Sequence, residues 1–403
     1  MNVLFVNNDN MVNNLAIFGG NPVSANQLVR PSPIGRSEIN AVARVLNSGV
    51  LSKAGRGKNV KIFEKKFAQF HNLKYAITTT SGTTALHTAI CSLGIKQGDE
   101  ILVPNLTFVS SASVVLQQNA TPVFVDIDPI TFCMITDDLE SKITKRTKAI
   151  MVVHLYGHPA EMNKIIKIAK KYNLKIIEDC AQSHGAKYKG KRVGTFGDIA
   201  CFSFYQTKNL TCGEGGMIIT DNEKLYKVCA SIVDHGLVNG NLQGYDYDRL
   251  GYNYHMTEIQ AVVGIEQLKR LERMNTQRII NANKYKHILR GEGLIFQDDN
   301  KNINHVYYVL TALLPKKLKD KRDWFVDAVR AEGVEINKIY PKPLSESELF
   351  SSFNDGSLYP NTFDITMRLF NFYTNPGVTD HYIKKTCEAV KKVLNYLNSK
   401  VYE

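Results

Sequence analysis

Between residues 61 and 230, short apolar runs alternate with longer stretches in which apolar residues recur every three or four positions. Short runs predict buried strands, and the wider spacing predicts helices that bury one face. The alternation therefore predicts an α/β fold with a mostly parallel sheet flanked by helices. Expected helices lie at 61–71, 82–93, 107–117, 137–142, 160–172 and 222–230, and expected strands at 75–79, 100–103, 122–125, 148–153, 174–178, 199–204 and 216–220.

The pattern changes on both sides of this region. Residues 1–30 contain clusters of asparagine and glycine, and we expect them to form a loosely packed N-terminal arm. A large domain is expected over 31–270, beginning with helical spacing at 37–46. A long helical pattern from 256 to 289 then leads into a smaller C-terminal α+β domain over 271–403. Within that domain we expect a strand at 306–313 and helices at 321–332 and 381–397.

The amino-acid composition limits the class of protein but does not indicate a particular function. The 403 residues suffice for one large and one smaller domain, and 44% hydrophobic with 22% charged residues is ordinary for a soluble globular protein. The net charge of +12 arises from scattered lysines rather than a basic block with interleaved aromatics, so we expect no nucleic-acid partner. The diffuse positive field would favour phosphorylated or nucleotide-linked small molecules.

Other sequence features set the expected location and argue against a metal site. No apolar run approaches the roughly 18 residues of a membrane span, and residues 1–6 lack the features of a signal peptide. We therefore expect a cytoplasmic protein with no membrane partner. The seven cysteines form no C-x-x-C pair and the ten histidines show no metal-ligand spacing, so no metal site is predicted.

Candidate chemistry centres on Lys208, within the segment FSFYQTKNLTCGEGGM that runs from Phe202 to Met217. The lysine lies between an apolar strand-like run and a glycine-containing loop, where backbone can approach a ligand closely. Such a placement suits a lysine held against a cofactor as a Schiff base. An isolated lysine at a strand-to-loop junction is more often a surface residue, so the interpretation depends on its neighbours.

Two upstream motifs supply those neighbours. An apolar run ends at Asp179, which places this carboxylate at the carboxyl edge of the sheet, where open α/β folds bind ligands. Residues 75–87 read as a strand, a turn of small hydroxyl residues and a helix, whose unpaired first-turn amides suit a phosphate. A phosphate site, an acid and a lysine in this order are typical of pyridoxal-phosphate enzymes with the aspartate-aminotransferase-like fold.

The motifs resemble those of the DegT/DnrJ/EryC1/StrS aminotransferases, which place an amino group on a keto-sugar or a cyclitol ketone. The resemblance extends from about Leu15 to the C-terminal region. It implies fold type I of the pyridoxal-phosphate-dependent transferases, with pyridoxal 5'-phosphate as cofactor. The motifs that carry it are PNLTFV at 104–109, HLYGHP at 154–159, EDCAQSHGA at 178–186, the lysine segment at 202–217 and LGYNY at 250–254.

The resemblance implies a role for individual residues. Lys208 would form the Schiff base and carry the proton, and Asp179 would hold the pyridine nitrogen. The other implied cofactor contacts are Gln182 at the ring hydroxyl, Phe108 on the ring face, Thr83, Thr84 and Ser203 at the phosphate, and Asn253 reaching the phosphate from the neighbouring subunit of a homodimer.

Substrate contacts are expected from His184, Tyr340, His255 and Arg56. His255 stands where many relatives have arginine, so anion recognition there is in question. The Gly55–Lys58 segment that contains Arg56 lacks the first glycine and the hydroxyl residue of a P-loop, and we interpret it as an active-site loop. Gln206 stands where relatives commonly have proline, and members that act on cyclitol ketones or make aminohydroxybenzoate often carry glutamine nearby.

We expect an aminotransferase that moves an amino group from glutamate or glutamine to a keto-sugar, in most members of the family a nucleotide-linked one. Three alternatives stay open: a cyclitol or a free or phosphorylated keto-sugar as acceptor, pyridoxal-phosphate-dependent dehydration or aromatisation, and a non-catalytic regulator that binds the cofactor. A dinucleotide-binding dehydrogenase is disfavoured, because Ser81-Gly82-Thr83-Thr84 has one glycine and does not match G-x-G-x-x-G.

Overall fold

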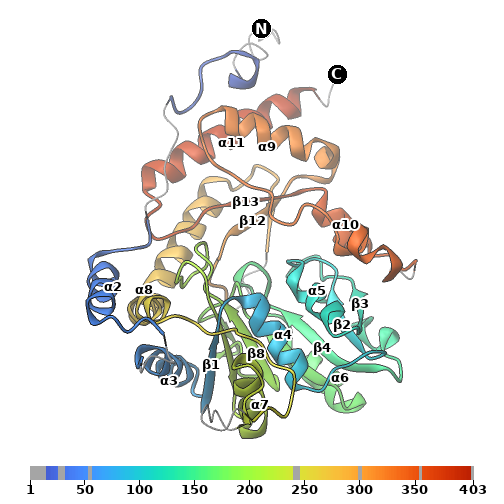
Figure 1. Cartoon of the computed structure of the whole chain (residues 1–403). Coiled ribbons are helices and arrows are strands. Elements are labelled where there is room, and N and C mark those ends of the chain that lie inside the picture. The colour runs from blue at the N-terminus through green and yellow to red at the C-terminus, as the bar shows by residue number, and fades with distance from the viewer. Residues whose placement is uncertain are drawn as a thin grey trace, which may run out of the picture.

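The computed structural model describes residues 15–25, 32–52, 57–238, 246–297, 302–353 and 356–400. A seven-stranded sheet with the order β1-β9-β8-β5-β4-β2-β3 forms the centre of the lower, larger part of the molecule in Figure 1. Its strands are β1 (Tyr75–Thr79), β2 (Glu100–Pro104), β3 (Thr121–Val125), β4 (Thr147–Val153), β5 (Lys175–Asp179), β8 (Ile199–Ser203) and β9 (Gly216–Thr220).

The sheet is mostly parallel, as expected. The pairs β2–β3, β2–β4, β4–β5 and β5–β8 are parallel, whereas β9 runs antiparallel to both of its neighbours, β1 and β8. The carboxyl ends of the parallel strands therefore share one edge, and Asp179 and Ser203 are the last residues of β5 and β8 at that edge.

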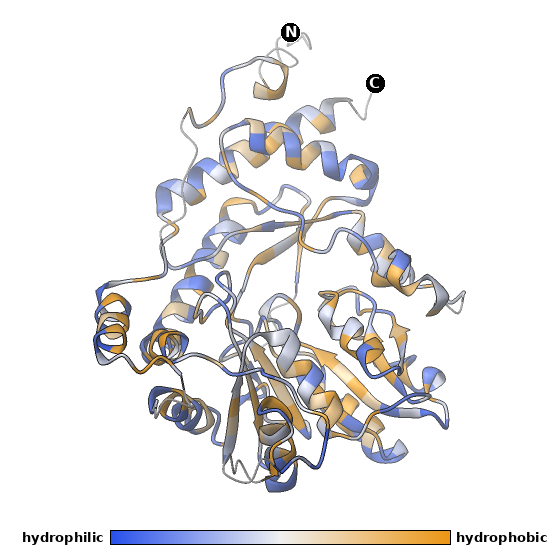
Figure 2. Cartoon of the chain, viewed as in Figure 1, coloured by the Kyte–Doolittle hydropathy of each residue, from blue (hydrophilic) through white to orange (hydrophobic). Residues whose placement is uncertain are grey.

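Helices cover the sheet, and the side chains of its central strands alternate between two apolar clusters. Cys201 of β8 joins the cluster that contains Ala85, whereas Phe202 joins the cluster that contains Phe67. Figure 2 shows the apolar residues concentrated on the strands and on the inward helix faces. The helices around the sheet are α3 (Asn59–His71), α4 (Gly82–Ser92), α5 (Ser110–Gln117), α6 (Met162–Tyr172) and α7 (Glu223–Val233), and α2 (Arg36–Ser48) packs on Val262 of the helix that follows the large part.

A single long helix, α8 (Glu258–Ile288), leads from the large part into the smaller upper part (Figure 1). The upper part has its own apolar cluster, which includes Phe325, Phe370 and Val390. No helix among the described residues combines the length and the apolar content of a bilayer span. The main elements of the upper part are β10 (Ile295–Phe296), β12 (Leu310–Leu313), α9 (Arg322–Ala331), α10 (Pro360–Thr366), β13 (Leu369–Phe372) and α11 (Asp380–Lys400).

Short elements complete the fold. They are the strands β6 (Lys187–Tyr188), β7 (Lys191–Arg192) and β11 (Ile303–Asn304), and the 3-10 helices η1 (Ala16–Phe18), η2 (Leu139–Lys142), η3 (Leu155–Gly157), η5 (Lys316–Lys321), η6 (Leu344–Glu346) and η7 (Glu348–Phe353). The strand expected at 306–313 begins only at Leu310, because Tyr307 has a left-handed backbone with φ of 43° that interrupts an extended chain.

The expected loose packing of the N-terminal arm is wrong for its described part. Leu15 is 1% exposed and belongs to the apolar cluster of the upper part. The backbone N–H groups of Ala16 and Val23 donate to the Glu332 carboxylate at 2.9 and 3.1 Å, and Lys392 pairs with the same carboxylate at 2.7 Å. Residues 1–14 and 26–31 lie outside the described residues.

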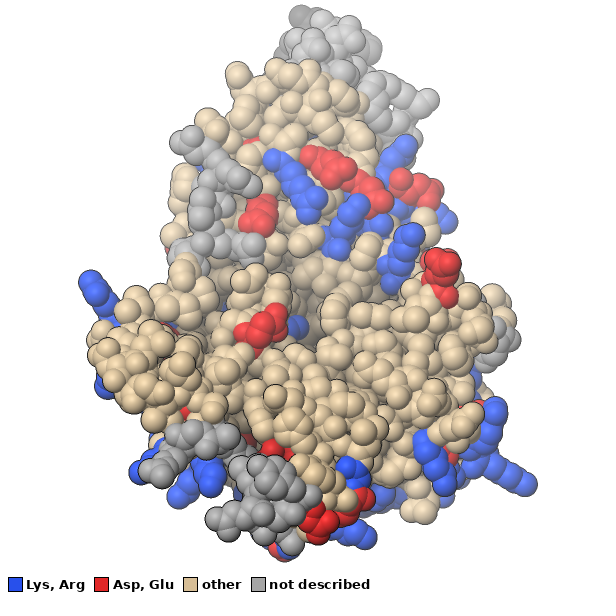
Figure 3. Space-filling model, viewed as in Figure 1, with Lys and Arg blue, Asp and Glu red and all other residues tan. Residues whose placement is uncertain are grey.

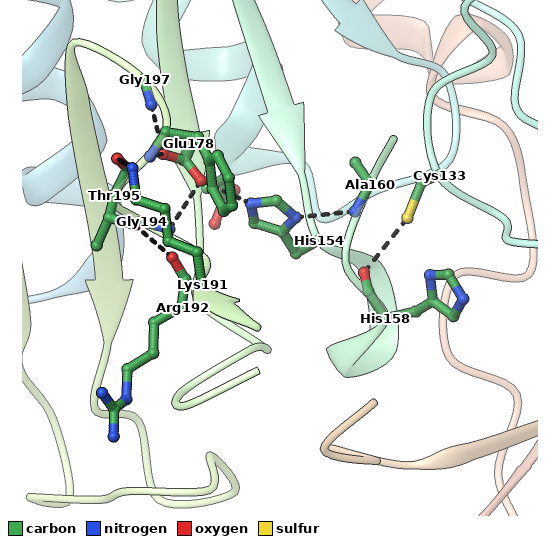
Figure 4. A network of polar contacts seen from close by, with 12 residues as sticks. Cys133, His154, His158, Ala160, Glu178, Lys191, Arg192, Gly194, Thr195 and Gly197 are labelled. Atoms are coloured by element: carbon green, nitrogen blue, oxygen red, sulfur yellow. Dashed lines mark hydrogen bonds and ion pairs between the residues drawn. The ribbon is translucent and has the colours of Figure 1, made fainter. Parts of the chain in front are cut away.

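Glu178, next to Asp179 on β5, is fully buried and anchors the loop before β8 (Figure 4). Its carboxylate accepts hydrogen bonds of 2.7 Å from the backbone N–H groups of Gly194, Phe196 and Gly197. His154 accepts the Ala160 N–H at Nδ1 (3.0 Å), so its Nε2 carries the hydrogen that faces Glu178 at 3.1 Å. Burial alone would raise the pKa of Glu178, but these donors lower it and keep the carboxylate ionised.

We expect Glu178→Ala to lower the free energy of unfolding by about 3–5 kcal/mol, because the donors around it stay buried without an acceptor. Glu178→Gln should lie between this variant and the wild type, since the amide oxygen still accepts. Urea unfolding followed by circular dichroism measures the effect. Glu223→Ala, which removes an exposed i,i+4 ion pair with Lys227, is the control and should leave the midpoint unchanged. Equal midpoints for Glu178→Ala and the control would contradict the anchoring role.

Two buried histidines make stability depend on pH. Burial lowers the pKa of His71 to about 4 and that of His184 to about 3, and the charge of Lys208 also lowers the pKa of His184. Below the ordinary histidine pKa of about 6.5 the unfolded chain binds protons that the folded chain does not. Stability is therefore expected to fall as the pH drops from about 6.5 towards about 4, by up to about 1.4 kcal/mol per pH unit for each histidine.

Urea unfolding at about pH 7 and about pH 5 tests this dependence. His71→Gln should reduce the slope of unfolding free energy against pH by about one proton, whatever it does to stability at neutral pH. His287→Gln is the matched control, because His287 is exposed near the end of α8. A slope that His71→Gln leaves unchanged would mean that this histidine does not titrate as its burial requires.

Candidate active site

A cavity of about 780 Å³ lies between the carboxyl edge of the large sheet and the smaller upper part. The large part contributes the first residues of α4, the end of β5 and the loop after β8, and the upper part contributes Glu335, Asn337, Tyr340 and Tyr373. Figure 3 shows this face hollowed at the boundary between the two parts. The sequence motifs around Asp179 and Lys208 thus converge on one cavity.

The N-terminus of α4 forms one wall. Ser81 caps the helix by accepting the Thr84 N–H at 3.1 Å, and the Thr84 hydroxyl accepts the Ser81 N–H at 3.0 Å. Ser81, Gly82 and Thr83 line the cavity, whereas the capping bonds turn the Thr84 hydroxyl away from it. Thr84 itself is not a lining residue, so its expected contact with the phosphate stays a prediction, whereas Ser81 lines the cavity without having been predicted to do so.

Two glycines let this helix approach the sheet. A Cβ on Gly82 would lie 2.7 Å from the Cβ of Ser203, and a Cβ on Gly216 would collide with the Ser81 carbonyl. Without these side chains, the first turn of α4 lies directly against the ends of β8 and β9. The positive end of the helix and the Ser203 hydroxyl therefore face the same part of the cavity, as a phosphate site requires.

Asp179 lies at the base of the cavity and is 5% exposed. Its carboxylate accepts the Ser111 hydroxyl at 2.8 Å and the Ala181 N–H at 3.1 Å, and the Ser111 hydroxyl lies 2.9 Å from that of Thr107. Within the described part of the chain no cationic side chain forms an ion pair with it, and burial raises its pKa. This buried carboxylate therefore has no positively charged partner among those residues. A cationic group of a bound ligand could take that place.

Aromatic side chains build the wall beside Asp179. The Gln182 amide donates to the Tyr340 hydroxyl at 2.7 Å and accepts the Tyr156 N–H at 2.7 Å. The Tyr156 and Tyr340 rings stack at 5.9 Å, and Phe108 lies 6.2 Å from Tyr340. Phe108 is 51% exposed although it lines the cavity, which leaves its ring face available to a ligand.

Lys208 projects from the loop after β8, with its Nζ 4.6 Å from the centre of the Tyr308 ring. The loop is held at both ends, because Phe204 donates to the Gly215 carbonyl at 2.8 Å and the Asn209 amide donates to Asn275 of α8 at 2.9 Å. The Thr207 hydroxyl lies 2.8 Å from that of Tyr308. These bonds fix the direction in which the lysine enters the cavity.

Several predicted contacts lie elsewhere. His184 is fully buried between Phe202 and Phe204, behind the cavity wall, so its expected substrate contact is wrong. Gln206 is exposed and donates to the Tyr205 hydroxyl at 3.4 Å rather than lining the cavity. Arg56 lies outside the described residues.

Asn253 and His255 do not line the cavity of their own chain. Asn253 is exposed on the segment before α8, and His255 pairs with Asp234 at 3.0 Å. An exposed Asn253 is compatible with a contact to a neighbouring subunit, which stays a prediction.

The arrangement fits pyridoxal phosphate. The α4 N-terminus with Ser203 suits the phosphate, the unpaired Asp179 suits a protonated pyridine nitrogen, and Lys208 lies within the same cavity. Sequence reasoning found these groups because each lies at the end of a strand or shortly after it. It missed Glu335 and Asn337, which enter from the upper part, where no strand pattern marks them.

Comparisons with known proteins agree with this geometry. The model of the DegT/DnrJ/EryC1/StrS aminotransferase family matches residues 33–391. The chain is 36% identical to the GDP-perosamine synthase of Escherichia coli O157:H7, over 90% of this chain and 97% of that protein. It is also 36% identical to the UDP-N-acetyl-3-dehydro-alpha-D-glucosamine 3-aminotransferase of Acidithiobacillus ferrooxidans, over 90% and 95% of the two chains.

Solved structures lead to the same family. An aminotransferase from Psychrobacter cryohalolentis superposes with a TM-score of 0.84 at 32% identity, covering 94% of this chain and all of that one. The expected family and fold are thereby confirmed. The chain belongs to the DegT/DnrJ/EryC1/StrS aminotransferase family, whose enzymes work with pyridoxal phosphate.

Proposed function

We propose that this protein transfers an amino group from glutamate or glutamine to a nucleotide-linked keto-sugar, in the biosynthesis of an amino sugar. The observation that carries the proposal is the convergence of Lys208, Asp179 and the α4 N-terminus on one cavity of about 780 Å³. The same cavity extends to polar side chains of the upper part, Glu335 and Asn337, which supply hydrogen-bonding groups for a sugar.

Two observations favour a nucleotide-linked acceptor over a cyclitol. The relatives named above act on GDP- and UDP-linked sugars according to their names, and they match 90% of this chain. The net charge of +12 favours an anionic diphosphate. Gln206, the residue that pointed towards cyclitols, is exposed and does not line the cavity of its own chain.

When bound, pyridoxal phosphate supplies a ring that withdraws electrons from the carbon bearing the amino group. The protein then has three tasks. The α4 N-terminus and Ser203 hold the phosphate, and the Asp179 carboxylate keeps the ring nitrogen protonated. Lys208 Nζ binds the cofactor between turnovers and, once released, takes a proton from one carbon and returns it to another.

The position of Lys208 suits this task. Its Nζ lies over the Tyr308 ring, inside the cavity that Asp179 also lines. The hydrogen bonds of Asn209 to Asn275 and to the Val306 carbonyl hold the loop, and with it Nζ, in place through the cycle.

We further propose a cytoplasmic homodimer with shared sites. All seven cysteines are free thiols, which suits a reducing compartment. Leu250 is 76% exposed and Tyr247 is 52% exposed, on the same segment as Asn253. A second copy of the chain would cover these apolar side chains while bringing Asn253 towards the cofactor phosphate of its partner.

The visible absorption of the protein loaded with pyridoxal phosphate, before and after L-glutamate, tests the proposed function. We expect a band from the lysine-bound cofactor that glutamate or glutamine removes and a keto-sugar restores. In Lys208→Ala the band should be absent and turnover should fall by at least about 10²–10⁴-fold, because both the covalent link and the proton carrier are lost. Lys227→Ala, on the exposed face of α7, is the control.

A loaded protein whose band neither amino donor changes would point instead to dehydration, another donor or a regulatory role. Multiple turnover retained in Lys208→Ala would contradict the assignment of the lysine.

Asp179→Asn keeps the shape of the side chain and removes its charge. Loss of an opposite charge changes a pKa by about 1–3 units, so we expect roughly 10–10³-fold slower turnover as the protonated fraction of the ring nitrogen falls. Cofactor binding should weaken less, because the phosphate contacts remain. Steady-state kinetics and cofactor titration measure the two effects. A turnover rate equal to that of the wild type would refute the role of Asp179.

A further inference from the structure

A second cavity, of about 310 Å³, borders the first. Lys208 and Asn375 line both cavities. Most of the remaining wall of the second cavity comes from one face of α8 and from the loop after β13, and Ser32, Pro33 and Asn209 complete it. The α8 residues recur at helical spacing, so a single helix face supplies them. They are Gln267, Arg270, Arg273, Met274, Gln277 and Arg278.

The second cavity is strongly cationic. Arg270, Arg273, Arg278 and Lys208 line it, and no aspartate or glutamate does among the described residues. Glu38 pairs with Arg270 and so neutralises one of these charges. Arg273 is exposed and makes no ion pair within the described ranges, which leaves its charge available to a ligand.

Arg278 is the unusual member of this group because it is 4% exposed and has no acidic partner in the described part of the chain. Its Nη1 makes two long contacts of 3.4 Å, to the Tyr308 carbonyl and the Thr374 hydroxyl, and its Nε has no hydrogen-bond partner among the described residues. Burial lowers its pKa to about 10, so the side chain stays cationic at neutral pH. An unpaired buried cation is costly, which indicates that an anion belongs beside it.

The surroundings of Arg278 are fixed before any ligand arrives. Asn281, one turn further along α8, donates to the carbonyls of Thr374 and Asn375 at 3.1 and 3.0 Å. The Thr374 hydroxyl donates to the Tyr307 carbonyl at 2.6 Å. The loop that closes the cavity is thus tied to the same helix that carries the arginines.

We propose that this cavity is an anion site that takes a carboxylate of the amino donor, held by Arg278 from inside and by Arg273 at the rim. The inference rests on the proposed function, since it names what binds beside Lys208. A guanidinium forms paired hydrogen bonds with a carboxylate, and the Nη2 group of Arg278 makes no hydrogen bond to the described residues, whereas Nη1 makes only the two long ones. The carboxylate would place the amino group of the donor in the adjoining cavity that Lys208 also lines.

The test uses the protein loaded with pyridoxal phosphate and two readouts. The first is the KM for L-glutamate in the donor half-reaction. The second is calorimetric binding of glutarate, which has the two carboxylates of glutamate but no amino group and cannot react. Arg278→Gln should raise the KM and the glutarate Kd by roughly 10–150-fold, with a smaller effect on the maximal rate. Arg273→Gln should raise both by about 2–5-fold, since its charge is exposed.

Arg290→Gln, an exposed arginine just beyond the end of α8, is the matched control and should change neither quantity. Arg278→Gln should unfold at the same temperature as the wild type or higher without ligand, since it removes an unpaired buried charge. If that variant does not fold, Arg273→Gln and the salt dependence of glutarate binding still test the site.

The outcomes distinguish a failure of the proposed function from a failure of the proposed anion site. A loaded protein that glutamate does not convert, but that binds glutarate through Arg278, refutes the donor and supports the anion site. Normal conversion with KM and glutarate binding within twofold of the wild type in both variants overturns the anion site and leaves the proposed function intact. Arg278-dependent binding of inorganic phosphate in preference to glutarate also overturns the assignment to a carboxylate.

Discussion

The site depends on the different hydrogen-bond partners of two adjacent carboxylates at the end of β5, Glu178 and Asp179. Glu178 is saturated by three backbone N–H groups and His154, all supplied by the protein. Asp179 receives two hydrogen bonds from neutral groups and no cation from the described residues. Because successive strand residues point to opposite faces, one acid locks the loop that precedes β8 and the other faces the cavity. The same strand thereby provides both the anchor and the charge that a cationic ring requires.

Much of the large part could be predicted because its strands are buried runs bounded by polar turns. The strand from Tyr75 to Thr79 was placed at its observed bounds. Asp179 and Lys208 were found because the first ends a strand and the second lies in the loop after one. Ser81 was not predicted as a lining residue because several hydroxyl residues stand together at this helix start, and the sequence alone does not tell which of them lines the cavity. His184 was misjudged because its neighbours Phe202 and Phe204 lie 18 or more residues away in sequence.

The contributions of the upper part were the least predictable. Glu335 and Asn337 come from a segment between α9 and η6 without a periodic pattern, so no local signal marks them as lining residues. The same holds for the N-terminal segment, whose packing depends on Glu332, more than 300 residues further along the chain. Interactions between such distant residues follow from the fold, and a single sequence carries no spacing rule for them.

The continuity of α8 has a mechanical consequence. Its 31 residues extend for about 46 Å, contain no proline and include one glycine, Gly264, whose backbone is pressed against the Phe63 ring. A helix with these properties resists hinging, which favours a fixed arrangement of the large and the upper part around the cavity between them. The conformational entropy of assembling the site is then lost at folding, so the binding of each substrate does not have to offset it again. The shape of a preformed cavity, rather than the closure of one part onto the other, would then select among acceptors.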